Sequence, residues 1–215
     1  MNWITRYWSS SIGRKQIMAK TGLLLCGFLI VHLAGNMLLF AGPEAFNNYA
    51  AALTSNKFLL IPAEIVLFSL FGVHIFLALK LTMENRSARG GVRYAVNTQA
   101  GDMNIATKTM PITGAWTLVF LVLHLVNFKF ADHSGELGLY GVVQSHFQNP
   151  VWSLYYIISM ALLGLHVGHG VQSTFQTYGL NHPKYEAIIK NASIGFGLLI
   201  FVGFSSFPVY FLIKG

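Results

Sequence analysis

Four histidines, each inside a long apolar stretch, are the residues of this sequence best placed to do chemistry: His32, His74, His124 and His166. An ionisable side chain is costly in hydrocarbon, so each of them is a functional candidate by default. A neutral imidazole is a good ligand for zinc, copper and haem iron. A single buried histidine is about as often a hydrogen-bonded packing residue, but four of them in four successive apolar stretches favour metal ligation.

The depth of these histidines sorts them into two pairs. Each lies about three residues past the middle of its stretch in the chain direction, which is roughly 4–5 Å along a helix. Successive membrane helices run in opposite directions, so this displacement alternates. His32 and His124 fall toward the outer side of the membrane, and His74 and His166 toward the cytoplasmic side. Two layers of paired imidazoles match two b-type haems stacked across a bilayer, which would give electrons a route through it.

Zinc or copper coordination is the main rival chemistry. Such sites usually gather several ligands at one depth, with carboxylate or thiolate among them. The paired histidines have no acidic companions, and Cys26 is the sole cysteine of the chain. The sequence therefore has no cysteine-rich iron–sulfur motif and no C-x-x-C-H haem attachment site, so that any haem would be held by coordination and packing.

Glycines are frequent close to the histidines. They allow either a bulky planar group or a neighbouring helix to approach closely, and for any single glycine the two interpretations are equally good. The positions concerned are Gly27, Gly35, Gly72, Gly164, Gly168 and Gly170.

The elements that must position the histidines are membrane helices. Of the 215 residues, 54% are hydrophobic and 10% are charged, whereas soluble chains contain about 25% charged residues. A helix of about 20 residues crosses a hydrocarbon core of roughly 30 Å. The sequence therefore predicts an all-α integral membrane bundle, one domain covering residues 1–215, with five transmembrane helices at about 18–41, 58–82, 111–130, 151–175 and 193–213.

The basic residues predict the orientation of this bundle. Five spans place the two termini on opposite sides, and basic residues concentrate in cytoplasmic segments. With a cytoplasmic N-terminus, three basic residues lie outside, namely Lys57, Lys129 and Lys214. The net charge of +7 is then explained by the loops rather than by nucleic-acid binding. The other basic residues lie inside: Arg6, Arg14, Lys15, Lys20, Lys80, Arg86, Arg89, Arg93, Lys108, Lys184 and Lys190.

The first fifteen residues, MNWITRYWSSSIGRK, have no apolar core followed by a small-residue cleavage site, so we expect no cleaved signal peptide. Trp3, Tyr7 and Trp8 alternate there with Arg6 and Arg14. Aromatic and basic side chains in this mixture are typical of a segment that lies at the headgroup level of the membrane.

The segments around the four histidines resemble one protein family. They read VHLAGNMLLF, GVHIFLALK, LVLHLVNF and LHVGHGVQSTFQ. In order and spacing they are similar to the dihaem cytochrome b membrane anchor of succinate:menaquinone oxidoreductases and quinol:fumarate reductases, in its single-chain five-helix form. The resemblance covers nearly the whole chain.

The resemblance implies two haem b groups and their ligands. His32 and His124 would bind the iron of the distal haem, and His74 and His166 that of the proximal haem, in agreement with the pairing by depth. In the fourth span the family has a glycine four residues after the ligand. Gly170 stands in this relation to His166, so that His169 is expected to make a hydrogen bond instead.

The resemblance also implies partners on the cytoplasmic face: a flavoprotein subunit and an iron–sulfur subunit. The chain would exchange electrons between quinone, most simply menaquinone, and the iron–sulfur clusters, and dicarboxylate chemistry would belong to the partners. The basic connector Met83–Thr109 is a surface on which they could dock, although a solvated loop that obeys the charge rule explains it equally well.

Quinone chemistry needs protons, and Glu64 is the acidic residue inside a predicted span. Desolvation would favour its neutral form. We expect Glu64 to exchange protons at an outer quinone site, with Asn36 or Tyr49 as a hydrogen-bond donor. The alternative is an interfacial glutamate without a part in the chemistry. Some fumarate reductases of this type have a glutamate two residues before the fourth-span ligand, where this chain has Gly164, so that route for protons is in doubt.

Haem propionates usually meet basic or hydroxyl side chains near the membrane surface. The candidates on the inner side are Lys20, Thr21, Lys80 and Arg86; those on the outer side are Lys129, Tyr155 and His146. Trp116, two turns before His124, is expected to pack against the proximal haem.

Two other functions fit parts of the pattern. A cytochrome b subunit of a hydrogenase or formate dehydrogenase also carries histidines in its spans, usually in four spans with a different ligand distribution. A metal-ion transporter could use the histidines as a relay. Absorption bands of b haems would separate the cytochromes from the transporter.

Overall fold

The computed structural model describes residues 2–88, 105–180 and 182–214, and the regular structure in these ranges is helical. Five segments are long and apolar enough to cross a membrane, which confirms the predicted number. They are α2 (Ser11–Asn36) with the 3-10 helix η1 (Met37–Ala41), α4 (Lys57–Ala88), α5 (Ile105–His124) with the π-helix η2 (Leu125–Lys129), α7 (Pro150–Thr177) and α8 (Pro183–Lys214).

Most of these helices are longer than the apolar stretches predicted. The helix α2 begins at Ser11 rather than near residue 18, because the Ser10 hydroxyl accepts a hydrogen bond from the backbone N–H of Gly13 and caps the helix. The helix α8 begins at Pro183 rather than near residue 193, and proline is favoured at a first helical position because its missing N–H would be unpaired there. Polar residues thus extend the helices beyond their apolar centres.

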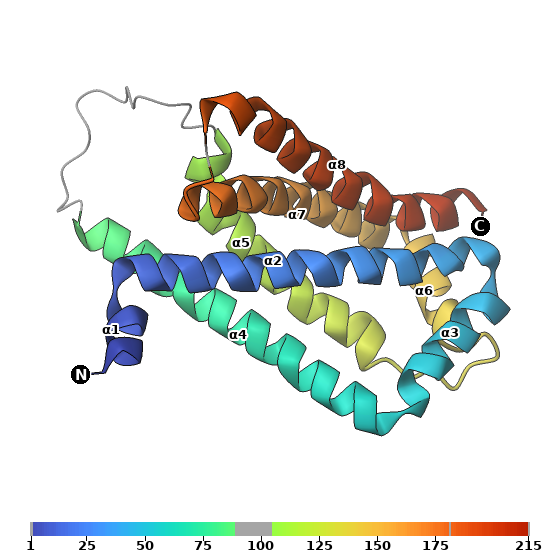
Figure 1. The fold of residues 1–215 in the computed structure, drawn as a ribbon. Coiled ribbons are helices and arrows are strands. Elements are labelled where there is room, and N and C mark those ends of the chain that lie inside the picture. Colours follow the sequence, from blue (N-terminus) through green and yellow to red (C-terminus); the bar gives the residue numbers. More distant parts are fainter. Residues whose placement is uncertain (1, 89–104, 181, 215) are drawn as a thin grey trace.

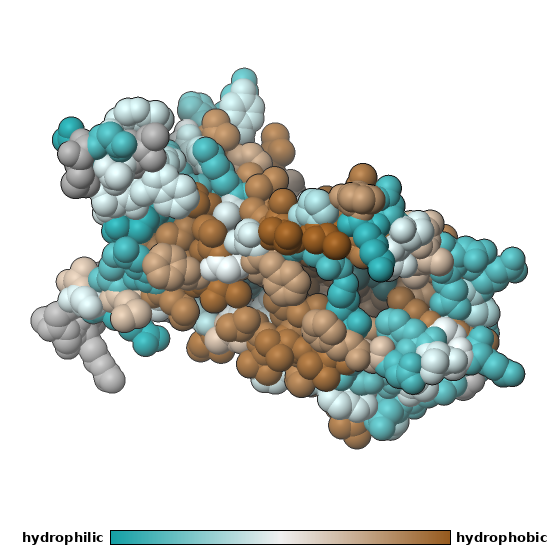
Figure 2. All heavy atoms as spheres, turned by 90° about the horizontal axis from the view of Figure 1, so that it is seen from below, coloured by the Kyte–Doolittle hydropathy of each residue, from teal (hydrophilic) through white to brown (hydrophobic). Residues whose placement is uncertain are grey.

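Successive long helices run in opposite directions, and the two chain termini lie at opposite ends of the bundle (Figure 1). We call these the N-terminal end and the C-terminal end. Helix α7 packs most extensively against α8 and also contacts α5 and α2, whereas α4 packs chiefly against α2. Apolar side chains cover the middle of the face shown in Figure 2, and hydrophilic ones gather toward the two ends, as expected for a bundle that meets lipid at its waist.

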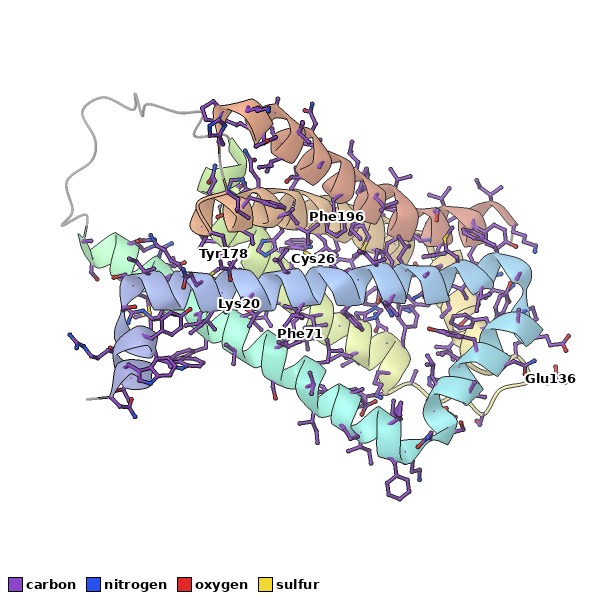
Figure 3. All side chains as sticks on the ribbon, in the orientation of Figure 1. Lys20, Cys26, Phe71, Glu136, Tyr178 and Phe196 are labelled. Atoms are coloured by element: carbon purple, nitrogen blue, oxygen red, sulfur yellow. The ribbon has the colours of Figure 1, made fainter. Side chains whose placement is uncertain are left out.

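The N-terminal end is marked by the short helix α1 (Trp3–Ser9), which forms where the sequence predicted a segment at the headgroup level. The side chains of Lys20 and Tyr178 are also found toward this end, whereas Glu136 lies at the other (Figure 3). The Tyr178 hydroxyl donates a hydrogen bond to the Gln16 carbonyl, at 3.1 Å, and so ties the end of α7 to α2. Arg89 and Arg93 of the predicted basic connector lie outside the described residues.

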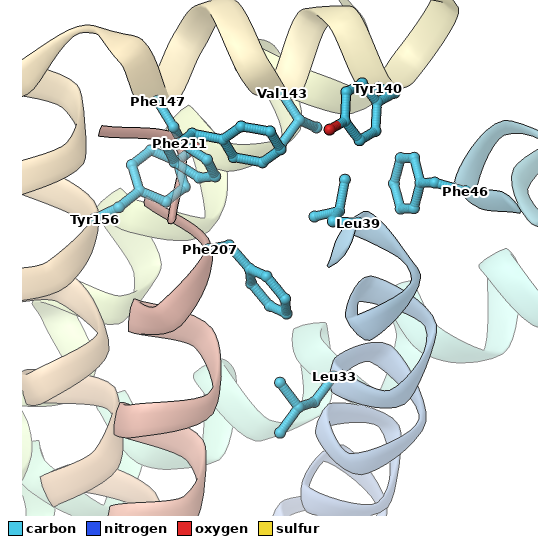
Figure 4. Close-up of a cluster of buried hydrophobic side chains, with 9 residues drawn as sticks. All are labelled: Leu33, Leu39, Phe46, Tyr140, Val143, Phe147, Tyr156, Phe207 and Phe211. Carbon is cyan, nitrogen blue, oxygen red and sulfur yellow. The ribbon is translucent and has the colours of Figure 1, made fainter. Parts of the chain in front are cut away.

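The C-terminal end is closed by two short helices, α3 (Pro43–Ser55) and α6 (Gly138–Gln148). The Asn47 side chain joins them, because it donates to the Leu137 carbonyl and accepts from the Tyr140 backbone N–H, at 2.8 and 3.0 Å. Beneath them lies an apolar cluster of mostly aromatic side chains (Figure 4), formed by Leu33, Leu39, Phe46, Tyr140, Val143, Phe147, Tyr156, Phe207 and Phe211. This cluster holds α2, α7 and α8 together at the end of the bundle.

Candidate metal centre

Near the C-terminal end, the structure brings the imidazole rings of His32 of α2 and His124 of α5 together. Their ring centroids lie 5.8 Å apart and the ring planes are almost perpendicular, at 88°. An imidazole nitrogen binds a metal ion at about 2 Å, so two imidazoles on opposite sides of one ion have centroids roughly 6 Å apart. The observed separation would allow both imidazoles to bind one metal ion.

Aromatic rings enclose this pair. Phe28 stacks on His32 at 5.3 Å and Phe120 stacks on His124 at 5.5 Å, each from one helical turn earlier. The Asn36 amide donates to the His32 carbonyl at 2.7 Å and also lies 3.5 Å from the His32 ring nitrogens. The Nδ1 atom of His124 is buried and has no hydrogen-bond partner. This layer is therefore apolar, and one of its imidazoles has an unsatisfied nitrogen.

Near the N-terminal end, His74 of α4 and His166 of α7 are each held by a threonine of a neighbouring helix. The Thr21 Oγ1 atom lies 3.1 Å from His74 Nδ1, and the Thr113 Oγ1 atom lies 3.2 Å from His166 Nδ1. Both threonines are buried. Each of these imidazoles is therefore held by a hydroxyl group of the helix packed beside its own.

A glycine follows each of these threonines and leaves room for the imidazole. A Cβ atom on Gly22 would lie 3.3 Å from the Cε1 atom of His74, and one on Gly114 would lie 3.1 Å from that of His166. Each Thr–Gly pair therefore holds one histidine ring, with the hydroxyl next to Nδ1 and the glycine against the ring edge. We call this arrangement a Thr–Gly seat. Of these four residues, sequence reasoning singled out Thr21 alone, as a propionate contact, and it missed this arrangement.

The signal that could have revealed it is an internal repeat with an offset of 92 residues. His124 follows His32 by this number, and His166 follows His74 by the same number. Residues 18–33 and 110–125 share methionine, threonine, glycine, phenylalanine, leucine and histidine at equivalent places, and both Thr–Gly pairs lie in these segments. The repeat, which we take as residues 18–82 and 110–174, pairs α2 with α5 and α4 with α7. Equivalent helices run in the same direction, as in parallel repeats related by an axis along the membrane normal.

The donor set fits haem better than a simple metal ion. Among the described residues, no group of three or more His, Cys, Asp or Glu side chains lies close enough together to hold a metal ion. Two protein ligands suffice for haem iron, because the porphyrin nitrogens fill the other positions. Helix α4 carries His74 but contributes Leu77 as its buried residue, and large apolar side chains such as Phe68 and Phe76 are exposed on it. Its apolar surface is thus open to a cofactor or to lipid.

His169 lies one turn after His166 on α7 and is partly buried. The contact of the Thr113 hydroxyl is with His166.

Glu64 differs from its predicted surroundings. It forms an ion pair with Lys129 of η2, and both side chains are partly exposed. The sequence did not predict this partner, because Lys129 belongs to another span. Of the two proposed donors, Asn36 faces His32, whereas the Tyr49 ring packs against Gly35.

The inner basic candidates lie at the end of the bundle that holds His74 and His166. Lys20 and Arg86 are exposed, and the Lys80 ammonium lies over the Phe76 ring, 5.9 Å from its centroid. Each could reach an anionic group near the membrane surface.

Of the outer candidates, His146 and Tyr155 both pack against the Trp152 ring at the C-terminal end, whereas Lys129 pairs with Glu64. The Asn127 amide lies 3.2 Å from His146 Nε2 and 3.3 Å from the Tyr156 hydroxyl, and the Tyr155 hydroxyl is buried without a partner. His146 belongs to α6, outside the five spans, and burial lowers its pKa. Trp116 donates to the Ser159 hydroxyl at 3.0 Å, which joins α5 to α7.

The glycines near the histidines divide between the two interpretations. Gly164 and Gly168 face Gly197 of α8, and a Cβ atom on Gly164 would lie 2.7 Å from the Gly197 carbonyl oxygen. These two glycines therefore serve helix packing. Gly27 and Gly72 have open space where a Cβ atom would be, so they remain available to a planar group.

Comparisons with known proteins found no matching family model, no matching curated protein and no matching solved structure.

Proposed function

We propose that this chain is a dihaem cytochrome b that anchors a succinate dehydrogenase or fumarate reductase complex in the cytoplasmic membrane and exchanges electrons with quinone. The observation that carries the proposal is the arrangement of four histidines in two layers of a five-helix membrane bundle. His32 and His124 would be the axial ligands in one layer, and His74 and His166 in the other.

Each haem, when bound, would take up and release one electron, so that two layers form a route across the bilayer. The chain's own residues hold the imidazoles and keep water away from them. Phe28 and Phe120 cover the rings of His32 and His124, while Thr21 and Thr113 fix those of His74 and His166. Lys20, Lys80 and Arg86 would meet propionates at the N-terminal end.

The charge distribution supports an orientation with the N-terminal end in the cytoplasm. The flavoprotein and iron–sulfur partners would then dock at this end, next to the layer of His74 and His166. The layer of His32 and His124 would lie nearer the outer surface, where we place the quinone site. Glu64, which pairs with Lys129, would accept a proton when quinol is oxidised there.

A test of this function is the haem content of the purified chain. We expect two b haems per chain, measured as the pyridine haemochrome, and sharp α bands in the reduced-minus-oxidised spectrum. Quinol should reduce them. We also expect a flavoprotein and an iron–sulfur protein to co-purify with a tagged chain from its native membrane.

The outcomes separate the alternatives. A chain with haem that co-purifies with a hydrogenase or formate dehydrogenase would move the proposal to another quinone-linked complex. A well-folded chain that contains no haem after expression in a haem-sufficient cell would overturn it.

A further inference from the structure

We infer that Thr21 and Thr113 are positioning residues that fix the imidazoles of His74 and His166 in the one neutral tautomer that can bind haem iron through Nε2. This inference rests on the proposed function and deepens it. It assigns the same task to two residues 92 positions apart, each on a helix next to the one that carries the ligand.

The direction of each hydrogen bond follows from the number of protons available. A threonine hydroxyl has one proton to donate. The Thr21 hydroxyl donates it to the Met18 carbonyl at 2.9 Å, so toward His74 Nδ1 its oxygen can act only as an acceptor. Nδ1 must then carry the imidazole proton, which leaves the lone pair on Nε2 free.

The same reasoning holds for the second histidine. The Thr113 hydroxyl donates to the carbonyls of Thr109 and Met110, at 3.2 and 3.1 Å. Its oxygen therefore accepts the proton of His166 Nδ1, at 3.2 Å. In both halves a chain of two hydrogen bonds leads from the imidazole through a hydroxyl to a backbone carbonyl.

The internal repeat supports this assignment independently of the hydrogen-bond geometry. Met18 and Met110, Thr21 and Thr113, and Gly22 and Gly114 occupy equivalent positions of the repeat. A threonine that served packing alone would not require an imidazole nitrogen at the same place in both halves.

The consequence concerns the electronic properties of the bound iron. A hydrogen bond that accepts the Nδ1 proton makes the imidazole a stronger donor to the metal and stabilises the ferric form. Loss of the hydroxyl should therefore raise the midpoint potential of the haem in this layer and weaken its retention. The haem between His32 and His124 should not respond.

The experiment uses the purified complex with Thr21→Val, Thr113→Val, and the matching serine variants. Valine keeps the shape of threonine and removes the hydroxyl, whereas serine keeps the hydroxyl. The readouts are haem content, a potentiometric titration of the α bands and the low-spin electron paramagnetic resonance signals. We expect Thr113→Val to raise the potential of one haem and to weaken its binding by about 10-fold, in the range typical for such hydrogen-bond partners.

Thr21→Val should raise the potential of the same haem, because the Thr21 hydroxyl contacts the other proposed ligand of that layer. Both serine variants should restore the wild-type values. Thr174→Val is the matched control, since Thr174 is equally buried and its hydroxyl donates to the Gly170 carbonyl at 2.9 Å. This control should change neither haem.

Three results would overturn the inference. The first is two haems with unchanged potentials in both valine variants. The second is a pair of valine variants that move different haems, and the third is a serine variant that behaves like valine. A wild-type protein without b haem would instead overturn the proposed function, and the inference with it.

Discussion

Each layer joins two histidines at equivalent positions of the internal repeat, but the surroundings of the two layers differ. At the N-terminal end, both imidazoles have a threonine on Nδ1 and a glycine against the ring. At the C-terminal end, His32 has the Asn36 amide nearby, whereas the equivalent residue beside His124 is Phe128 and the Nδ1 atom of His124 has no partner. One layer has kept the symmetry of the repeat, and the other has lost it.

Comparing the two layers shows which contacts of the imidazoles occur in both and which occur in one. The stacking of Phe28 on His32 and of Phe120 on His124 is common to both halves, so an apolar cover is needed on each side. The hydrogen bond on Nδ1 is symmetric in one layer alone. We therefore expect the two haems to have different potentials, with the haem at the C-terminal end the higher, because the His124 imidazole lacks an acceptor for Nδ1.

Removing a ligand gives the largest expected effect. On the proposed function, His124→Ala and His166→Ala should each reduce the haem content from two per chain to one, since each would remove one of the two ligands of one layer. Redox titration should then show that the remaining haem is the low-potential one in His124→Ala and the high-potential one in His166→Ala.

His169→Ala is the control for the second of these variants and should retain both haems. If His169→Ala lost a haem while His166→Ala kept both, the ligand in α7 would be the other histidine. If either single substitution removed both haems, the layers would not be independent sites.

The next effect compares one glycine position in the two halves. Gly164 of α7 lies against α8, whereas its equivalent in α4, Gly72, has open space beside it. Gly164→Ala should lower the free energy of unfolding by about 1–3 kcal/mol, as overpacking usually does. Gly72→Ala should leave it unchanged or raise it by up to about 1 kcal/mol, because alanine is the better helix former.

Thermal unfolding in detergent measures the stability of both variants, and their haem content is a second readout. A Gly72→Ala protein that folds normally but loses haem would show that Gly72 contacts the cofactor. Equal destabilisation by both variants would contradict the packing seen around α8.

The arrangement of the layers could be predicted from the sequence because it depends on few quantities. The length of the apolar stretches determines the number of spans, and alternating helix directions determine the depth of each histidine. His32 and His124 lie together for this reason. The Thr–Gly seats could also have been found, since the chain aligns with itself at an offset of 92 residues.

Contacts that depend on helix rotation could not be predicted. The spans are apolar around most of their circumference, so the sequence does not show which face of α7 meets α8, and Gly164 could have faced a cofactor or a helix. The pairing of Glu64 with Lys129 joins residues that are 65 positions apart. It depends on the π-helix η2 that follows His124, and nothing in the local sequence indicates such a turn.

Breaking the Glu64–Lys129 ion pair should have the smallest effect on the free energy of unfolding and a larger effect on the rate of quinol oxidation. It lies at the C-terminal end, and the repeat places Tyr156 at the position equivalent to Glu64, so it is one more asymmetry of that layer. Because both side chains are partly exposed, Glu64→Gln should change the free energy of unfolding by less than about 1 kcal/mol. Both haems should remain, while quinol oxidation should slow because the proton acceptor is lost.

Lys129→Met is the matched control, since it removes the same ion pair but leaves the carboxyl group. If Glu64→Gln kept both haems and the wild-type quinol turnover, Glu64 would be an interfacial residue, and the asymmetry at this end would have a structural origin.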